Sequence, residues 1–169
     1  MKKRAAVLLA VLSMSFAPAF PVTATEQTRQ EAVAARGVDV MPFDLQATTH
    51  IFTKTGTGGV QQVVAKHADD ARQIALIRTH LQDIAGKFSK TDFSGPTFIH
   101  GSGMPGLAEL KAAKPSAINI RYRDISSGGE IDFESRDPRL VAAIHTWFDA
   151  QLSDHGSDAK GHDHSNMKH

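Results

Sequence analysis

The sequence predicts an α+β domain, a two-layer sandwich in which a four-stranded, mostly antiparallel sheet of two hairpins carries two helices on one face. Pairs of alternating apolar and polar stretches joined by glycine-rich turns indicate the hairpins. Apolar residues at spacings of three and four indicate the helices. The elements follow the order hairpin, helix, hairpin, helix over residues 42–156, and the length of 169 residues suits a single domain.

The first hairpin and helix occupy the first half of this domain. Apolar and polar residues alternate from Phe43 to Ile51, which predicts a strand with His50 on its polar face. A glycine-rich turn at 55–59 leads to a second strand over Val60–Ala65. Asp69 and Asp70 then stand where anions favour a helix N-terminus. The apolar stripe of this helix consists of Ile74, Ile77, Leu81, Ile84 and Phe88.

A connection rich in glycine and proline, residues 89–116, separates the halves and contains one short predicted helix through Leu107, Leu110 and Ala113. Alternation returns at 118–122 and 131–133 around a turn at 126–129, which predicts the second hairpin. Asp137 and Pro138 form a good N-cap and first-turn pair for the last helix, and Gly156 is expected to end it. Its apolar side consists of Leu140, Ile144, Trp147, Phe148 and Gln151.

The N-terminus has the pattern of a secretory signal peptide. Lys2, Lys3 and Arg4 precede an apolar run and small residues suited to signal peptidase, so we expect residues 1–24 to be removed and the protein to be periplasmic. The run is interrupted by proline and is short for a membrane span, so we expect no stable membrane anchor after cleavage. Residues 25–41 are polar without a sustained pattern and are predicted to be a leader or linker.

Charge and composition exclude several classes of function. The full chain has 19 Lys and Arg against 18 Asp and Glu, and loss of the three N-terminal cations leaves the mature chain near −2. A protein that binds nucleic acid needs a cluster of basic residues, and the sequence shows none. The chain has no cysteine, which rules out thiol catalysis, cysteine-based metal sites and iron–sulfur chemistry.

Histidine is the unusual component, because four of the nine histidines lie in the last fifteen residues. Residues 157–169 have nothing to bury and are predicted to be a disordered tail. Imidazole binds copper, nickel and zinc, and thioether sulfur favours Cu(I), so a flexible tail can wrap one ion. Its donors are His162, His164, Met167 and His169.

The domain offers a second set of donors. His100 and Met104 flank a glycine-rich segment of the long connection, where a ligand can approach closely. An intradomain metal site would combine three or more of six residues, whose convergence the sequence does not reveal: His50, His80, His100, Met104, His145 and His155. His50, His80 and His145, each taken alone, are more simply explained as amphipathic residues on a polar face or at the edge of an apolar stripe. A histidine at position 155 also suits the dipole at the C-terminus of the last helix.

Two other classes of function stay open. The first is a small enzyme with His145 and Asp149 as an acid–base pair and residues 95–106 as the rim of its substrate site. The chain lacks the G-x-S-x-G, H-E-x-x-H and P-loop motifs, which favours a binding protein over an enzyme. The second is an exported interaction module whose long loop contacts a partner of unknown identity.

Four segments resemble a family of small exported bacterial proteins whose members often carry the label aspartate carbamoyltransferase. The segments read FDLQATTH at 43–50, QIALIRTHL at 73–81, IHG with MPGL at 99–107, and HTWFDAQLSDHG at 145–156. The resemblance covers about residues 43–156. Its motif positions coincide with Met104 and with the five domain histidines named above, and it implies a short tail that contains His or Met. A carbamoyltransferase needs an S-T-R-T motif and about twice this length, so we expect no such activity.

The sequence therefore predicts an exported metal-binding protein that buffers or delivers an ion. Copper is the favoured ion, with nickel or zinc as alternatives. The expected ligands come from the His/Met tail and from an intradomain site.

Overall fold

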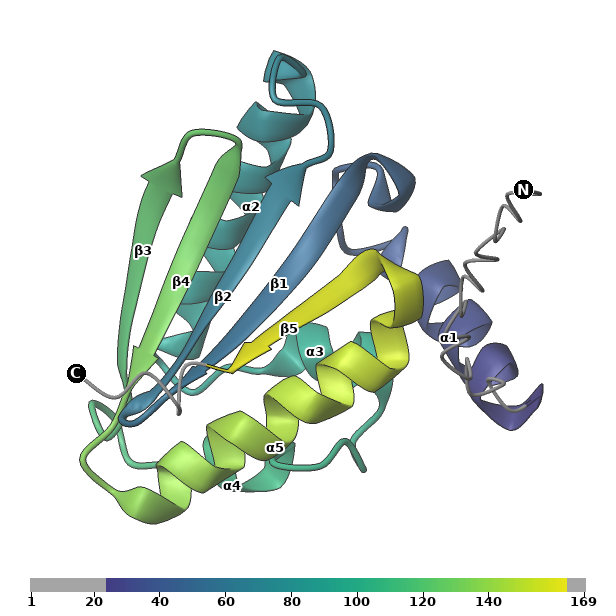
Figure 1. Ribbon diagram of the computed structural model, residues 1–169. Helices are drawn as coiled ribbons and strands as arrows, with labels where there is room; N and C mark the ends of the chain where they lie inside the picture. Colours follow the sequence, from purple (N-terminus) through teal and green to yellow (C-terminus); the bar gives the residue numbers. More distant parts are fainter. Residues whose placement is uncertain (1–23, 164–169) are drawn as a thin grey trace, which may run out of the picture.

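The computed structural model describes residues 24–163, which form a five-stranded sheet with five α-helices (Figure 1). The predicted signal peptide lies almost wholly outside the described residues, as do His164, Met167 and His169 of the tail. The α+β class is confirmed. The sheet has one strand more than the sequence predicted, and two of the five helices were not predicted.

The sheet is built on the two predicted hairpins. The first consists of β1 (Thr48–Thr55) and β2 (Gly58–Ala65), and the second of β3 (Asn119–Ile125) and β4 (Gly128–Glu134). The hairpins join through an antiparallel β2–β4 pair, and the order is β3-β4-β2-β1-β5. The short β5 (Ala159–Asp163) runs parallel to β1 and forms one edge.

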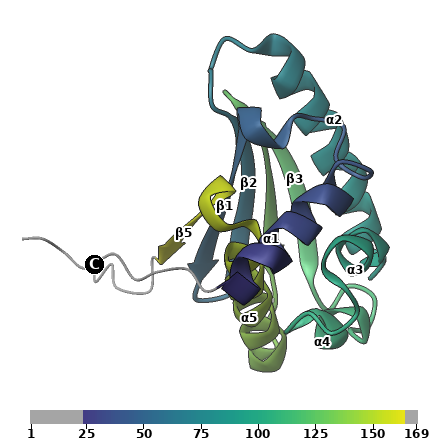
Figure 2. The ribbon, with the colours of Figure 1, turned by 90° about the vertical axis from the view of Figure 1, so that its right-hand side faces the viewer.

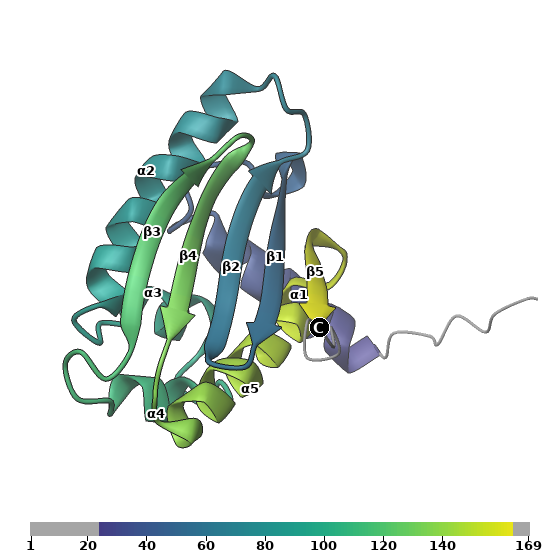
Figure 3. The same ribbon diagram turned by 60° about the vertical axis from the view of Figure 1, so that its left-hand side comes forward.

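The helices of residues 24–163 all lie on one face of the sheet, and none of them covers the other face (Figures 2 and 3). The long helices are α2 (Ala71–Phe88) and α5 (Pro138–His155), and each begins at the predicted cap, where Asp70 or Asp137 accepts a hydrogen bond from a backbone N–H of the first turn. Most of the predicted stripe of α2 is buried, and all of that of α5 is.

Residues 25–41, predicted to be a leader or linker, are largely helical. The first helix, α1 (Ala24–Gly37), consists mostly of good helix formers, with an acidic first turn and a basic last turn that suit the helix dipole. Its sequence lacked an apolar stripe because it docks mainly through polar side chains, with Val33 as its buried apolar residue. The prediction of a leader or linker was therefore wrong for residues 25–37.

The start of the predicted tail is also ordered. Residues Gly156–Asp158 form a 3₁₀ turn, and β5 follows, so the prediction of disorder was wrong for 157–163. The sequence of β5 has little intrinsic strand propensity. Its pairing with β1 and the contact between Gly161 and Leu152 of α5 override that preference.

Three further details differ from what the sequence predicted. The chain before β1 forms a 3₁₀ turn at Leu45–Ala47 instead of extending the strand back to Phe43. The long connection contains α3 (Ser94–His100), which was not predicted, as well as α4 (Leu107–Lys111), which was. His50 lies on the inward face of β1, not on a polar outer face, and is 4% exposed.

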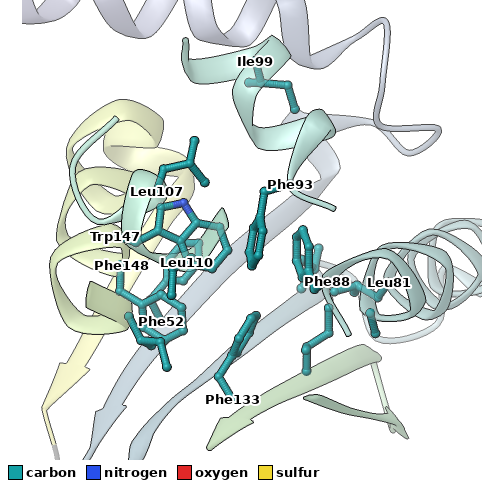
Figure 4. Close-up of a cluster of buried hydrophobic side chains, with 14 of the residues drawn as sticks. Phe52, Leu81, Phe88, Phe93, Ile99, Leu107, Leu110, Phe133, Trp147 and Phe148 are labelled. Carbon is teal, nitrogen blue, oxygen red and sulfur yellow. The ribbon is translucent and has the colours of Figure 1, made fainter. Parts of the chain in front are cut away.

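The core is aromatic at its centre (Figure 4). Trp147 of α5 is fully buried, with its ring centroid 5.7 to 5.8 Å from those of Phe88, Phe93 and Phe133. Edge-on and tilted ring contacts of this kind add to the free energy gained by burial. The packing fixes α5 and α3 against the sheet and so sets the positions of the residues that end these helices.

Candidate functional site

Four histidines from four different elements line one cavity. His50 comes from β1, His80 from α2, His100 from the last residue of α3 and His155 from the last residue of α5. The cavity has a volume of about 50 Å³, enough for an ion and one or two small molecules of the size of water. The fold thus brings together residues that are up to 105 positions apart.

Three of the rings are in close contact. His50 and His155 are stacked, with centroids 4.7 Å apart and planes 10° from parallel. The ring of His100 meets that of His155 edge-on, with centroids 5.2 Å apart. His80 lies farther out, where Phe43 packs against both its ring and that of His50. We refer to His50, His100 and His155 as the histidine cluster.

A buried carboxylate fixes the orientation of His100. Nδ1 of His100 lies 2.8 Å from Oδ2 of Asp154, which requires the proton on Nδ1 and leaves Nε2 as an acceptor or ligand. Both side chains are almost fully buried. The Asp154 carboxylate also accepts two hydrogen bonds from the Arg29 guanidinium of α1, so its charge is balanced.

Helix α1 contributes more than this ion pair to the wall beside the cluster. Nη2 of Arg29 also donates to the backbone oxygen of His100, and Nε of Arg36 donates to that of Ile99 at 2.6 Å. These carbonyls lie at the C-terminus of α3, where helix oxygens lack intrahelical partners. The first helix therefore holds in place the segment that presents His100.

The cavity favours neutral imidazoles. Burial lowers the pKa of His50 to about 4, with further lowering by His80 and His100. Burial also lowers the pKa of His155 well below its ordinary value, as well as that of His100, where Asp154 acts in the opposite direction. Near neutral pH the cluster carries lone pairs and no positive charge, which is the form in which imidazole binds a metal.

Two glutamines in the cavity wall have buried polar atoms without partners. Gln61 of β2 and Gln151 of α5 are 6% and 5% exposed, and the Oε1 atom of each has no hydrogen-bond partner. A buried acceptor left unsatisfied costs about 1–3 kcal/mol. Both residues line the cavity, but these two oxygens are closed to a molecule of the size of water.

A metal ion suits the donor set of this cavity but not the ring orientations as they stand. In the part of the chain that the structure describes, no three His, Asp or Glu side chains are arranged to hold one ion. The lone pair of an imidazole nitrogen lies in the ring plane, so two stacked parallel rings cannot both point at an ion between them. Loading requires rotation of a ring about its terminal torsion, which is a soft torsion for histidine.

The other predicted site residues lie elsewhere. His145 faces the β1–β2 turn, where its Nε2 lies 2.9 Å from the Thr55 oxygen and 2.8 Å from that of Gly58. Asp149 pairs with Lys54, and Met104 is buried in the hydrophobic core. None of these three lines the cavity of the histidine cluster. The structure thus separates His145 and Asp149 from the site and gives each a local partner.

The described part of the tail begins beside the cluster, where Ala159 pairs with His50, but its histidine lies farther along β5. His162 is an exposed residue of β5, opposite Thr53 in the parallel pair. Lining residues that the sequence did not single out are Gln61, Gln151 and Met41. The burial of a glutamine within the apolar stripe of α5 was the available signal for Gln151, whereas nothing in the local pattern marked Arg29.

Comparison with known proteins does not assign the chain to a family. No family model, no curated protein and no solved structure gives a significant match. Among residues 24–163, no helix has the length and apolar character of a membrane span.

Proposed function

We propose that this protein is an exported metal-binding protein whose principal site is the histidine cluster. Copper is the favoured ion, with nickel or zinc as alternatives, because imidazole is a good ligand for all three. The observation that carries the proposal is the convergence of three mostly buried imidazoles, His50, His100 and His155, on one small cavity.

The contact between Asp154 and His100 supports this proposal. Histidines that bind metals usually donate their second ring N–H to a carboxylate or carbonyl, which fixes the tautomer and strengthens the ligand. Asp154 makes this contact and leaves Nε2 of His100 available. His155 is the ring best suited to turn, because it ends α5 and is followed by Gly156, whose φ is +53°.

The tail has a separate place in the proposal. His162 stands exposed on β5, and the chain continues to His164, Met167 and His169. We assign this segment a weaker, independent role in collecting ions, with Cu(I) favoured by the thioether of Met167. His80 lies beside the cluster and supports its walls through Phe43.

Copper titration of four proteins tests the proposal. The wild-type chain is compared with a chain truncated after Asp163, with His155→Phe, which keeps a ring stacked on His50, and with His67→Ala, which changes an exposed histidine. We expect one tight site per chain that survives truncation and His67→Ala, and that weakens about 10–100-fold in His155→Phe.

Two outcomes contradict the proposal. If truncation removes the tight site while His155→Phe leaves it intact, the ion is held by the tail and not by the domain. If no variant and no wild-type protein retains copper, nickel or zinc after dialysis, the protein is not a metal carrier. Thermal unfolding of each variant shows whether a loss of binding reflects a loss of fold.

Acid–base catalysis at the same cavity is the second candidate. The hydrogen bond between Asp154 and His100 is also the arrangement of a general base and its orienting carboxylate. The described side chains that line the cavity include no serine, threonine or cysteine, so His100 would activate water or remove a substrate proton. A rate for ester hydrolysis by the metal-free protein that Asp154→Asn abolishes would favour this candidate.

A further inference from the structure

Helix α1 and the turn that follows it form one unit on one side of the histidine cavity. Val40 and Met41 belong to this turn and line the cavity. The backbone N–H groups of both residues donate to the Gly37 oxygen, at 3.0 and 2.8 Å, which ties them to the end of the helix. A Cβ at position 37 would lie 2.7 Å from Cε of Met41, so the Met41 side chain packs back against α1. We refer to residues 24–41 as the α1 segment.

The α1 segment is held mainly by polar contacts with the ends of two helices. Arg29 and Arg36 donate to backbone oxygens at the end of α3, and Gln30 donates to one at the end of α5. The Arg29 side chain is 48% exposed, so water competes for its hydrogen bonds. Among residues 25–37, Val33 is the one buried apolar side chain. Segments with few buried apolar contacts open locally while the rest of a domain stays folded.

The chain beyond Met41 is anchored separately. Phe43 is buried against the rings of His50 and His80, and the backbone N–H of the next residue donates to the Gln73 side chain of α2. The exposed Pro42 joins these two parts. Hinges are short stretches between parts that are each held in place, and residues 41–43 fit this description.

A second hollow lies between α1 and the turn after α5. It has a volume of about 190 Å³, and it reaches the surface, because Glu31 and Ser157 in its wall are exposed. Met41 and His155 line both this hollow and the histidine cavity, so they form the partition between the two spaces. Because Met41 is tied to α1, displacement of the helix removes one side of the partition.

We propose that the α1 segment is a hinged lid that turns about residues 41–43 and, when displaced, joins the hollow to the histidine cavity and admits a small molecule from solvent. The closed cavity of about 50 Å³ is far smaller than the cavities of about 150 Å³ that hold an aromatic ring. The lid acts in the metal-free protein and requires no ion in the cavity.

His50 is a suitable reporter of lid opening. It lies on β1, and its ring contacts Phe43, Phe52 and His155, so changes to the arginines of α1 remove no partner of this ring. Diethyl pyrocarbonate acylates neutral imidazole and is larger than the closed cavity. The rate at which it modifies His50 therefore measures how often the cavity opens.

Acylation of the full-length, metal-free protein at pH 7, followed for each histidine by mass spectrometry, tests the proposal. We expect His50 to react about tenfold faster in the double variant Arg29→Ala, Arg36→Ala, which loses hydrogen bonds with a charged partner. The exposed His67 should react at an unchanged rate. Met41→Ala removes the partition and keeps both arginines, so it should also accelerate the reaction of His50, whereas Met41→Leu should restore the wild-type rate.

Arg139→Ala is the matched control. It removes an arginine ion pair at the start of α5, so the rate at His50 should not change. Hydrogen exchange of α2 in the same samples separates opening of the lid from unfolding of the domain. Faster modification of His50 with unchanged exchange in α2 supports the lid. A wild-type rate at His50 in both the double variant and Met41→Ala overturns it, as does a rate that rises only in step with exchange in α2.

Discussion

The imidazole rings of His50 and His155 lie parallel, with centroids 4.7 Å apart, although one belongs to the second strand from the sheet edge and the other to the last residue of a helix. Two rings stacked in this way repel each other if both are protonated. The contact therefore belongs to the neutral state of the cluster and couples the integrity of the site to pH.

The metal-free protein should lose stability as the pH falls from about 6.5 to 4. The pKa of His50 is about 4 in the folded protein against an ordinary value of 6.5, so the unfolded chain takes up the proton first and is favoured in this range. This shift in the pKa of His50 lowers the free energy of unfolding by about 3 kcal/mol between pH 7 and pH 4. Urea unfolding of wild type and His50→Phe at pH 7 and pH 4, in the presence of a chelator, measures it.

His50→Phe keeps a flat ring in the stack but cannot titrate, so its stability should fall less between these two pH values. The difference between the two proteins isolates His50 from the carboxylates that titrate in the same range. His67→Phe changes an exposed histidine and serves as the control. Equal pH dependence of wild type and His50→Phe would refute the prediction.

Asp154→Asn should weaken copper binding about 10–100-fold, because His100 loses the acceptor that fixes its tautomer. Competition with a chromophoric chelator measures the affinity. Asp149→Asn lies on the same helix and removes only an ion pair with Lys54, so the affinity of that variant should match the wild type. If Asp154→Asn binds copper with unchanged affinity, then copper binding does not require His100 to be held in one orientation.

The double variant Arg29→Ala, Arg36→Ala should release α1 while leaving the sheet intact. These arginines provide the hydrogen bonds to Asp154, His100 and Ile99 that dock the helix. We expect amide exchange in α1 to become about tenfold faster or more, since hydrogen bonds with a charged partner contribute about 1.5–3 kcal/mol each. Hydrogen exchange with mass spectrometry resolves the helix. The control is Arg139→Ala, which removes an ion pair with Asp137 at the start of α5. If the amides of α1 exchange as slowly in the double variant as in the wild type, the arginines do not dock the helix.

Gly106→Ala should destabilise the fold by more than about 2 kcal/mol. Gly106 has φ +77°, and a Cβ there would lie 2.3 Å from the Ala143 oxygen of α5. Gly103→Ala changes a glycine of the same connection around which a Cβ meets nothing within 4 Å, and should be close to neutral. Thermal unfolding compares the two variants. Similar melting temperatures would mean that α4 shifts to admit the methyl group.

The sequence predicted the parts of the fold whose apolar pattern is local. Both hairpins and the long helices follow from residues that bury one face, such as the stripe from Ile74 to Phe88. Helix α1 was missed because it docks through arginines, and β5 because its pairing with β1 overrides weak propensity. The extra elements therefore depend on tertiary contacts that no local window contains.

The sequence predicted several residues of the candidate site but not how they are arranged in space. His50, His80, His100 and His155 were among the expected ligands, and the structure brings them to one cavity, whereas it places His145 and Met104 elsewhere. The alternation around Phe43 assigned His50 to the wrong face, because a 3₁₀ turn resets the strand register at Leu45–Ala47. Gln61 and Asp154 acquire their significance only from the residues that pack against them.

The spacing of the cluster along the chain has a consequence for when it forms. His50, His100 and His155 are separated from each other by about fifty residues, and the last of them precedes β5 near the end of the domain. Closing such long loops costs conformational entropy that contacts elsewhere in the fold must offset, so we expect the site to form together with the rest of the domain. An ion bound there would be acquired after folding is complete, from whichever compartment the chain folds in.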